Sequence, residues 1–161
     1  MCLIEHGYII ATILAMDYLK RTVELSKASL DAGEFPAGAV LITSGGAIYE
    51  SRPSLAHNHG EMMVIDDAIQ AEGAPLTGAV MYSSMQSCLM CTAKMYWAGI
   101  GNVHYVIPKS AIDASYAYEN SSNTEEAGKS FFTPVRMQHD PELQEEAMSH
   151  YQSWVMKLEH E

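Results

Sequence analysis

Two short segments of the chain carry residue types that can hold a metal ion and move protons. The first is His59-Gly60-Glu61 and the second is Cys88-Leu89-Met90-Cys91. A Cys-x-x-Cys pair places two thiolates at chelating distance, and an imidazole adds a third ligand of the kind that zinc prefers. Three protein ligands leave the fourth zinc position open for water, the arrangement of a catalytic site. Glu61, two residues after His59, is then close enough to reach that water without binding the metal.

Other interpretations of the same residues stay open. The cysteine pair alone is compatible with a redox dithiol, although this leaves His59 and Glu61 without a role. A closed structural zinc site of His57, His59, Cys88 and Cys91 would instead make the chain a binding module. The side chains of two histidines separated by one residue point in different directions on a helix, however. A closed site also leaves Glu61 without a role. We therefore favour a catalytic zinc site over a structural one and over no metal.

The elements that must position these residues follow from hydrophobic periodicity and from glycine and proline stop signals. Apolar spacing predicts helices and short apolar runs predict strands, with a Gly45-Gly46 hairpin turn and a loop over 119–130. The expected helices cover about 16–32, about 62–73, 88–98 and 141–158, and the expected strands cover 37–42, 47–49, 80–82 and 103–107. This alternation indicates an α/β fold with helices on the faces of a sheet.

Both ligand segments open predicted helices, whose positive N-terminal ends favour thiolates over thiols. Ser87 stands where an N-cap residue is expected.

Length, charge and composition limit the classes of protein to which the chain can belong. The chain has 161 residues, so we expect one domain over 16–161, preceded by an extension over 1–15 that has no Lys or Arg and does not fit a secretion signal. A net charge of -11 argues against a nucleic-acid binder, and no apolar run is long enough for a membrane span. Three cysteines do not suggest a disulfide framework.

The motif resembles the signature of the zinc-dependent cytidine/nucleobase deaminase superfamily, H-x-E followed by P-C-x-x-C. The segments 34–40 and 93–98 are also similar to that superfamily, so the resemblance covers roughly 16–108. It implies a three-layer α/β/α cytidine deaminase-like sandwich with a mixed five-stranded sheet, a Zn²⁺ cofactor and a homodimer. It also implies hydrolytic deamination of a small base or nucleoside, with Glu61 as the base and then the acid. Because both cysteines must stay free to bind zinc, we expect a reducing compartment, the cytoplasm.

Two later segments, 112–119 and 145–154, resemble the guanine deaminase branch. In that branch the C-terminal part, here about 110–161, crosses to the partner subunit. By this resemblance Gly60, Ala37, Trp97 and Glu146 are candidate substrate contacts. Trp97 is equally compatible with a core position, and Glu146 fits a solvated helix face better.

Three departures from the family pattern concern Ser87, Pro53 and Ala114. Ser87 replaces the proline before the first cysteine. Pro53 and Ala114 stand where residues that read the base are expected, so guanine itself is in doubt as the substrate. Two other functions remain alternatives: a tRNA adenosine deaminase, which needs a basic RNA channel, and a catalytically silent zinc-binding module.

Overall fold

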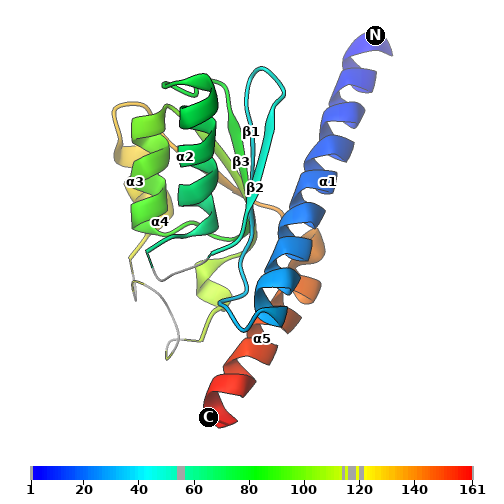
Figure 1. The fold of residues 1–161 in the computed structure, drawn as a ribbon. Coiled ribbons are helices and arrows are strands. Elements are labelled where there is room, and N and C mark those ends of the chain that lie inside the picture. The colour runs from blue at the N-terminus through cyan, green and yellow to red at the C-terminus, as the bar shows by residue number, and fades with distance from the viewer. Residues whose placement is uncertain (1, 54–56, 114, 116–118, 120–121, 161) are drawn as a thin grey trace.

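The computed structural model describes residues 2–53, 57–113, 115, 119 and 122–160, with the backbone alone over 2–13. It forms three layers around one mixed sheet, as predicted (Figure 1). The elements in chain order are α1 (Cys2–Asp31), β1 (Ala39–Ile42), β2 (Ile48–Ser51), α2 (Gly60–Glu72), β3 (Val80–Met85), α3 (Leu89–Ala98), β4 (Asn102–Ile107), η1 (Lys109–Ala111), α4 (Thr124–Ser130), β5 (Arg136–His139), η2 (Pro141–Leu143) and α5 (Gln144–His160).

The five strands lie in the order β2-β1-β3-β4-β5. β1 pairs antiparallel with both β2 and β3, whereas β3, β4 and β5 run parallel. The β1–β2 hairpin turns at Gly46, whose φ of 86° lies in the left-handed region that glycine adopts without strain. The parallel half of the sheet matters for function, because ligands of such sheets bind beyond the carboxyl ends of the strands.

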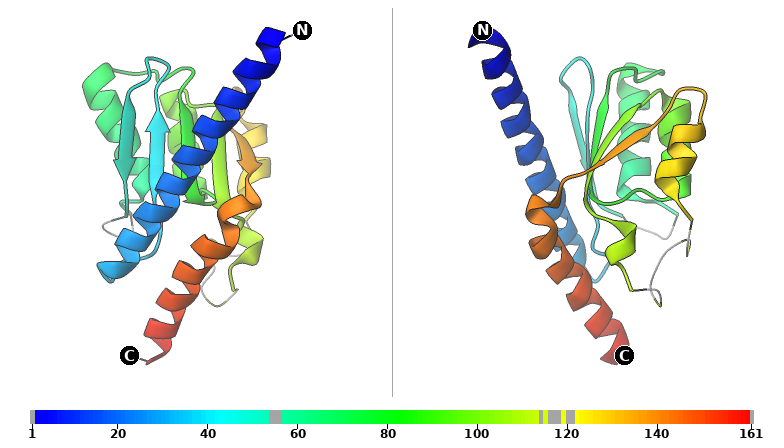
Figure 2. Two further views of the ribbon diagram at one scale, coloured as in Figure 1. Left: turned by 90° about the vertical axis from the view of Figure 1, so that its right-hand side faces the viewer. Right: turned by 180° about the vertical axis from the view of Figure 1, so that it is seen from behind.

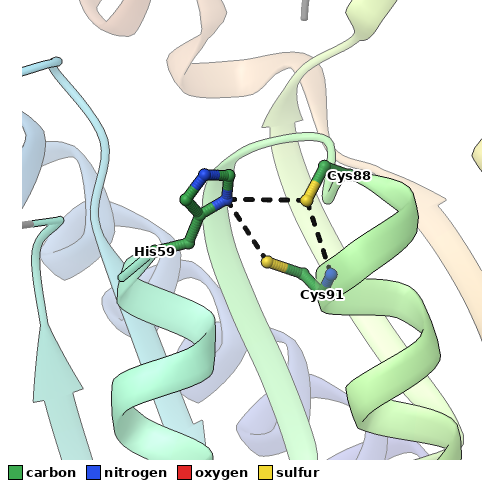
Figure 3. Close-up of side chains that lie close together, drawn as sticks. All are labelled: His59, Cys88 and Cys91. Atoms are coloured by element: carbon green, nitrogen blue, oxygen red, sulfur yellow. Dashed lines mark hydrogen bonds between the residues drawn. The ribbon is translucent and has the colours of Figure 1, made fainter. Parts of the chain in front are cut away.

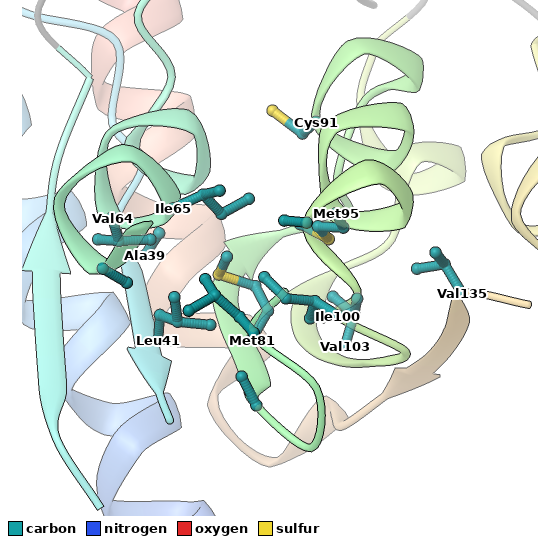
Figure 4. Close-up of a cluster of buried hydrophobic side chains, with 14 of the residues drawn as sticks. Ala39, Leu41, Val64, Ile65, Met81, Cys91, Met95, Ile100, Val103 and Val135 are labelled. Atoms are coloured by element: carbon teal, nitrogen blue, oxygen red, sulfur yellow. The ribbon is translucent and has the colours of Figure 1, made fainter. Parts of the chain in front are cut away.

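Helices α1 and α5 cover one face of the sheet and α2, α3 and α4 cover the other (Figures 1 and 2). Alternate residues of the strands therefore face two separate cores. Leu41 and Met81 pack against α2 and α3, whereas Val40 and Tyr82 pack against α1 and α5. Figure 4 shows the first core, which lies directly beneath Cys91 and so supports the helix that carries the cysteines.

Three elements differ from the sequence-based expectation. The segment expected to be a loop contains α4, because the Asn123 side chain caps its first turn by accepting a hydrogen bond from the Glu126 N–H at 3.1 Å. The short strand β5 follows, and its four mainly exposed residues gave no apolar run to detect. The N-terminal helix begins at Cys2 and runs without a break into the part expected at 16–32. The division into an extension and a domain stays a prediction.

The C-terminal helix α5 packs against α1 and β4 of its own chain, with Ala147 and Tyr151 in the core. Exchange of this segment between subunits stays a prediction. Over the described residues, the structure contains no helix that is both long and apolar enough to cross a bilayer.

Candidate metal centre and active site

The three residues predicted as zinc ligands meet where two helices begin. His59 is the N-cap residue of α2 and Cys88 is the N-cap residue of α3, and Cys91 lies one turn into α3. β3 delivers the chain to Cys88, so the cluster lies beyond the carboxyl end of a parallel strand. Figure 3 shows the imidazole of His59 facing both sulfur atoms.

The donor atoms have the spacing that a tetrahedral zinc ion requires. His59 Nδ1 lies 3.5 Å from Cys88 Sγ and 3.4 Å from Cys91 Sγ, and all three donor atoms lie within 4.8 Å of one another. Tetrahedral zinc with ordinary Zn–N and Zn–S bonds separates nitrogen and sulfur ligands by about 3.6 Å. The residues present therefore fit a zinc ion.

His57 is exposed and does not join this group of donor atoms. The described residues thus supply three ligands, and the closed four-ligand site considered from the sequence does not form among them.

The two thiols have opposite tendencies to ionise. The pKa of Cys88 is lowered to about 5, mainly because the Cys91 thiol donates a hydrogen bond to it, and His59 and the Cys91 backbone N–H add to the effect. The pKa of Cys91 is raised, because its proton is held by Cys88 and because it is buried. Zinc binding must therefore expel a proton from Cys91, since the thiolate is the ligand.

Glu61 lies in the first turn of α2 and is only 7% exposed. Burial and the neighbouring charge of Cys88 raise its pKa, while the Ser87 hydroxyl opposes this by hydrogen bonding to Oε1 at 3.0 Å. A buried carboxyl with a raised pKa is suited to accept and return protons near neutral pH. The cluster of ligands thus lies beside a group that can perform acid–base chemistry.

Two further contacts hold the ligand-bearing helices in place, and neither was predicted. Lys94 of α3 donates to the Met62 carbonyl of α2 at 3.0 Å and pairs with Asp66 at 2.5 Å, so it links the two helices. The Glu119 carboxylate accepts a hydrogen bond from the Leu89 N–H at the start of α3. Neither contact has a sequence signature, because each joins residues far apart in the chain.

The four candidate substrate contacts lie in different places. Gly60 is the first residue of α2, and a Cβ there would lie 3.1 Å from the Ser51 carbonyl, so its small size serves the packing of α2 on the sheet. Ala37 is partly buried in the segment before β1 and packs with the α1–α5 core. Glu146 is exposed on α5, in the layer on the other side of the sheet from the metal ligands.

Trp97 is 81% exposed near the C-terminal end of α3, and the alternative of a core position is wrong. It lies nine residues after Cys88, about 13 Å along the helix axis. Two of the residues that depart from the deaminase pattern are Pro53 and Ala114. Pro53 is buried after β2, and Ala114 lies outside the described residues.

Ser87 does not cap α3 as expected. Cys88 takes that place, because its own Sγ accepts from the Cys91 N–H at 3.4 Å. The Ser87 hydroxyl is directed to Glu61 instead.

Comparison with known proteins agrees with this geometry. Residues 14–107 match the family model described as the cytidine and deoxycytidylate deaminase zinc-binding region. A tRNA-specific adenosine deaminase of Bacillus subtilis (strain 168) is 33% identical over 97 residues, which are 53% of this chain and 57% of that protein, so the match spans little more than half of that relative. The guanine deaminase of the same organism is 28% identical over 150 residues, covering 85% of this chain and 91% of that protein.

A solved structure of the guanine deaminase from Nitrosomonas europaea superposes with a TM-score of 0.68 at 15% identity, covering 86% of this chain and 83% of that one, and so supports the fold alone. The family model covers more than half of this chain and includes all three metal ligands. The protein therefore belongs to the family of the cytidine and deoxycytidylate deaminase zinc-binding region.

Proposed function

We propose that the protein is a zinc-dependent hydrolytic deaminase of a small aminated heterocycle, either a nucleobase or a nucleoside, with a guanine-like purine favoured. The observation that carries the proposal is the buried Glu61 carboxyl beside the cluster of His59, Cys88 and Cys91. A redox dithiol or a structural zinc site requires no buried acid at that place. The 85% coverage of this chain by a guanine deaminase favours a purine base.

The three ligands would hold the zinc ion, which when bound supplies a Lewis acid that makes water acidic at neutral pH. Glu61 takes the proton from the attacking water and delivers it to a ring nitrogen of the substrate. The water oxygen forms a bond to the carbon that carries the amino group. Glu61 then takes the second proton from that oxygen and gives it to the amino group, the C–N bond breaks, and ammonia leaves while a carbonyl forms. One carboxyl therefore acts first as base and then as acid.

Charge distribution supports a small substrate over tRNA. Nine Lys and Arg stand against 20 Asp and Glu, and all nine lie in the described part of the chain. Six of the nine form an ion pair within the chain, namely Arg21, Lys27, Arg52, Lys94, Lys109 and Lys129. A surface that binds a phosphate backbone needs basic groups free to meet it.

A tRNA adenosine deaminase is the second candidate, and the 33% identity to such an enzyme is the observation in its favour. We expect the protein to form a homodimer and to reside in the cytoplasm, where the thiols of Cys88 and Cys91 stay reduced.

The test is release of ammonia by the zinc-loaded protein from a panel of purines, pyrimidines, their nucleosides, pterins, triazines and tRNA. We expect turnover of a free base or nucleoside, and loss of turnover after a chelator removes the metal. Turnover of tRNA alone would favour the second candidate. No ammonia from any substrate would favour the silent zinc module.

A further inference from the structure

Ser87 differs from the deaminase pattern, which has proline at this position, and the structure gives the serine a new contact. Its hydroxyl lies 3.0 Å from Glu61 Oε1. An ionised carboxylate can only accept, so the hydroxyl donates. Ser87 is 1% exposed, so water does not compete for this hydrogen bond.

A second buried hydroxyl reaches the same oxygen. Ser83 of β3, which is 2% exposed, lies 3.4 Å from Glu61 Oε1 through its Oγ. Ser83 lies within β3 and Ser87 follows the strand by two residues, so one short stretch of chain supplies both donors. Both serines contact Oε1 and neither contacts Oε2.

These contacts matter because a glutamate side chain has several rotamers and its two carboxylate oxygens are equivalent. A proton shuttle works only when one oxygen stays in reach of the reacting atoms, and a small misplacement costs rate rather than binding. A buried hydrogen bond to a charged group is strong enough to select one orientation.

We propose that Ser87 is a positioning residue that anchors Oε1 of Glu61 and thereby turns Oε2 toward the attacking water and the leaving amino group. The proposal rests on the proposed function for its effect on rate, but not for its effect on the position of Glu61. Ser83 assists from the strand. A proline at position 87 has no hydroxyl and cannot make this contact.

The test compares Ser87→Ala, Ser87→Thr and the control Ser26→Ala. Ser26 is also fully buried and hydrogen-bonded, through Oγ to the Pro36 carbonyl at 3.0 Å, but it lies on α1 across the sheet from Glu61. We expect Ser87→Ala to lower kcat about tenfold, equivalent to about 1.4 kcal/mol. KM should change less than about twofold, as expected when only a transition-state interaction is lost. Ser87→Thr should restore kcat, and Ser26→Ala should keep it.

Two further measurements accompany the kinetics. Zinc content of Ser87→Ala should equal that of the wild type, and its crystal structure should show the Glu61 carboxylate rotated or in several conformers. An unchanged Glu61 conformer overturns the inference, and so does loss of zinc in proportion to kcat, which would mean that Ser87 acts on α3. If no heterocycle is a substrate, the proposed function fails. The crystal structure still tests whether Ser87 fixes the orientation of the Glu61 carboxylate.

Discussion

The carboxylate of Glu119 accepts a hydrogen bond from the backbone N–H of Leu89, and both carboxylate oxygens lie 2.9 Å from the nitrogen. Glu119 also pairs with Lys109 Nζ at 3.2 Å, and Lys109 bonds to the Ser122 carbonyl at 3.1 Å. A carboxylate at the N-terminus of a helix accepts a hydrogen bond from an N–H that has no partner within the helix. Its negative charge also interacts favourably with the helix dipole. This contact fixes the first turn of α3, which is the turn that presents both cysteine ligands.

Glu119→Ala should therefore destabilise the protein. It leaves the N–H of Leu89 and the largely buried Lys109 ammonium without this acceptor, and we expect a loss of about 1–3 kcal/mol in the free energy of unfolding. Urea denaturation measures it. The matched control is Glu126→Ala, which breaks an exposed pair with Lys129 and should cost less than about 1 kcal/mol. Equal effects of the two substitutions would contradict the proposed anchoring of α3.

The metal site predicts opposite effects for two neighbouring histidines. His59→Ala removes one of three ligands and should abolish stoichiometric zinc binding, whereas exposed His57→Ala should retain about one zinc ion per chain. Metal analysis of the dialysed proteins measures both. Zinc loss in His57→Ala with zinc kept in His59→Ala would show that the imidazole ligand has been assigned wrongly.

Zinc binding should release protons and weaken as the pH falls. Cys88, with its pKa lowered to about 5, is already a thiolate at pH 7, whereas Cys91 has a raised pKa and still carries its proton. The metal displaces that proton, so about one proton per zinc should be released near pH 7. Titration calorimetry in buffers of different ionisation enthalpy counts it. A value near zero would mean that both thiols are ionised before the metal arrives.

α1 lies close to Gly38, the residue directly before β1. A Cβ on Gly38 would lie 2.5 Å from Leu25 Cβ and closer still to the Thr22 carbonyl oxygen. Gly38→Ala should therefore cost about 1–3 kcal/mol of stability by overpacking. Gly45→Ala is the control, because its nearest neighbour is Thr43 Oγ1 at 3.8 Å, and thermal unfolding should barely change. A neutral Gly38→Ala would show that α1 can shift freely on the sheet.

Much of the fold was predictable because it depends on local signals. The spacing of Leu19, Val23 and Leu30 indicated a helix, and Gly99 correctly marked the end of α3 with its left-handed conformation. The three metal ligands were found because their chemistry and spacing are unusual in combination. α4 and β5 were missed because they are short and mainly polar, so neither produces a hydrophobic pattern.

The contacts of the residues around the metal ligands could not be predicted in the same way. Ser87 was recognisable as a departure from the motif, but only the folded geometry shows that Cys88 caps the helix and frees the serine for Glu61. The same limit applies to Trp97, because an aromatic residue on an apolar helix has the same pattern whether a neighbour covers it or solvent does. Contacts between distant segments decide these cases.

In the proposed reaction, Glu61 moves protons beside a zinc ion held by His59, Cys88 and Cys91. The most direct test is Glu61→Gln, which keeps the size of the side chain and removes its capacity to accept a proton. Zinc content and ammonia release are measured on the same preparation, with the best substrate of the wild type. We predict about one zinc ion per chain and a loss of at least about a thousandfold in kcat, within the range of general acid–base catalysis. Full turnover by a zinc-loaded Glu61→Gln protein would show that Glu61 does not carry the proton.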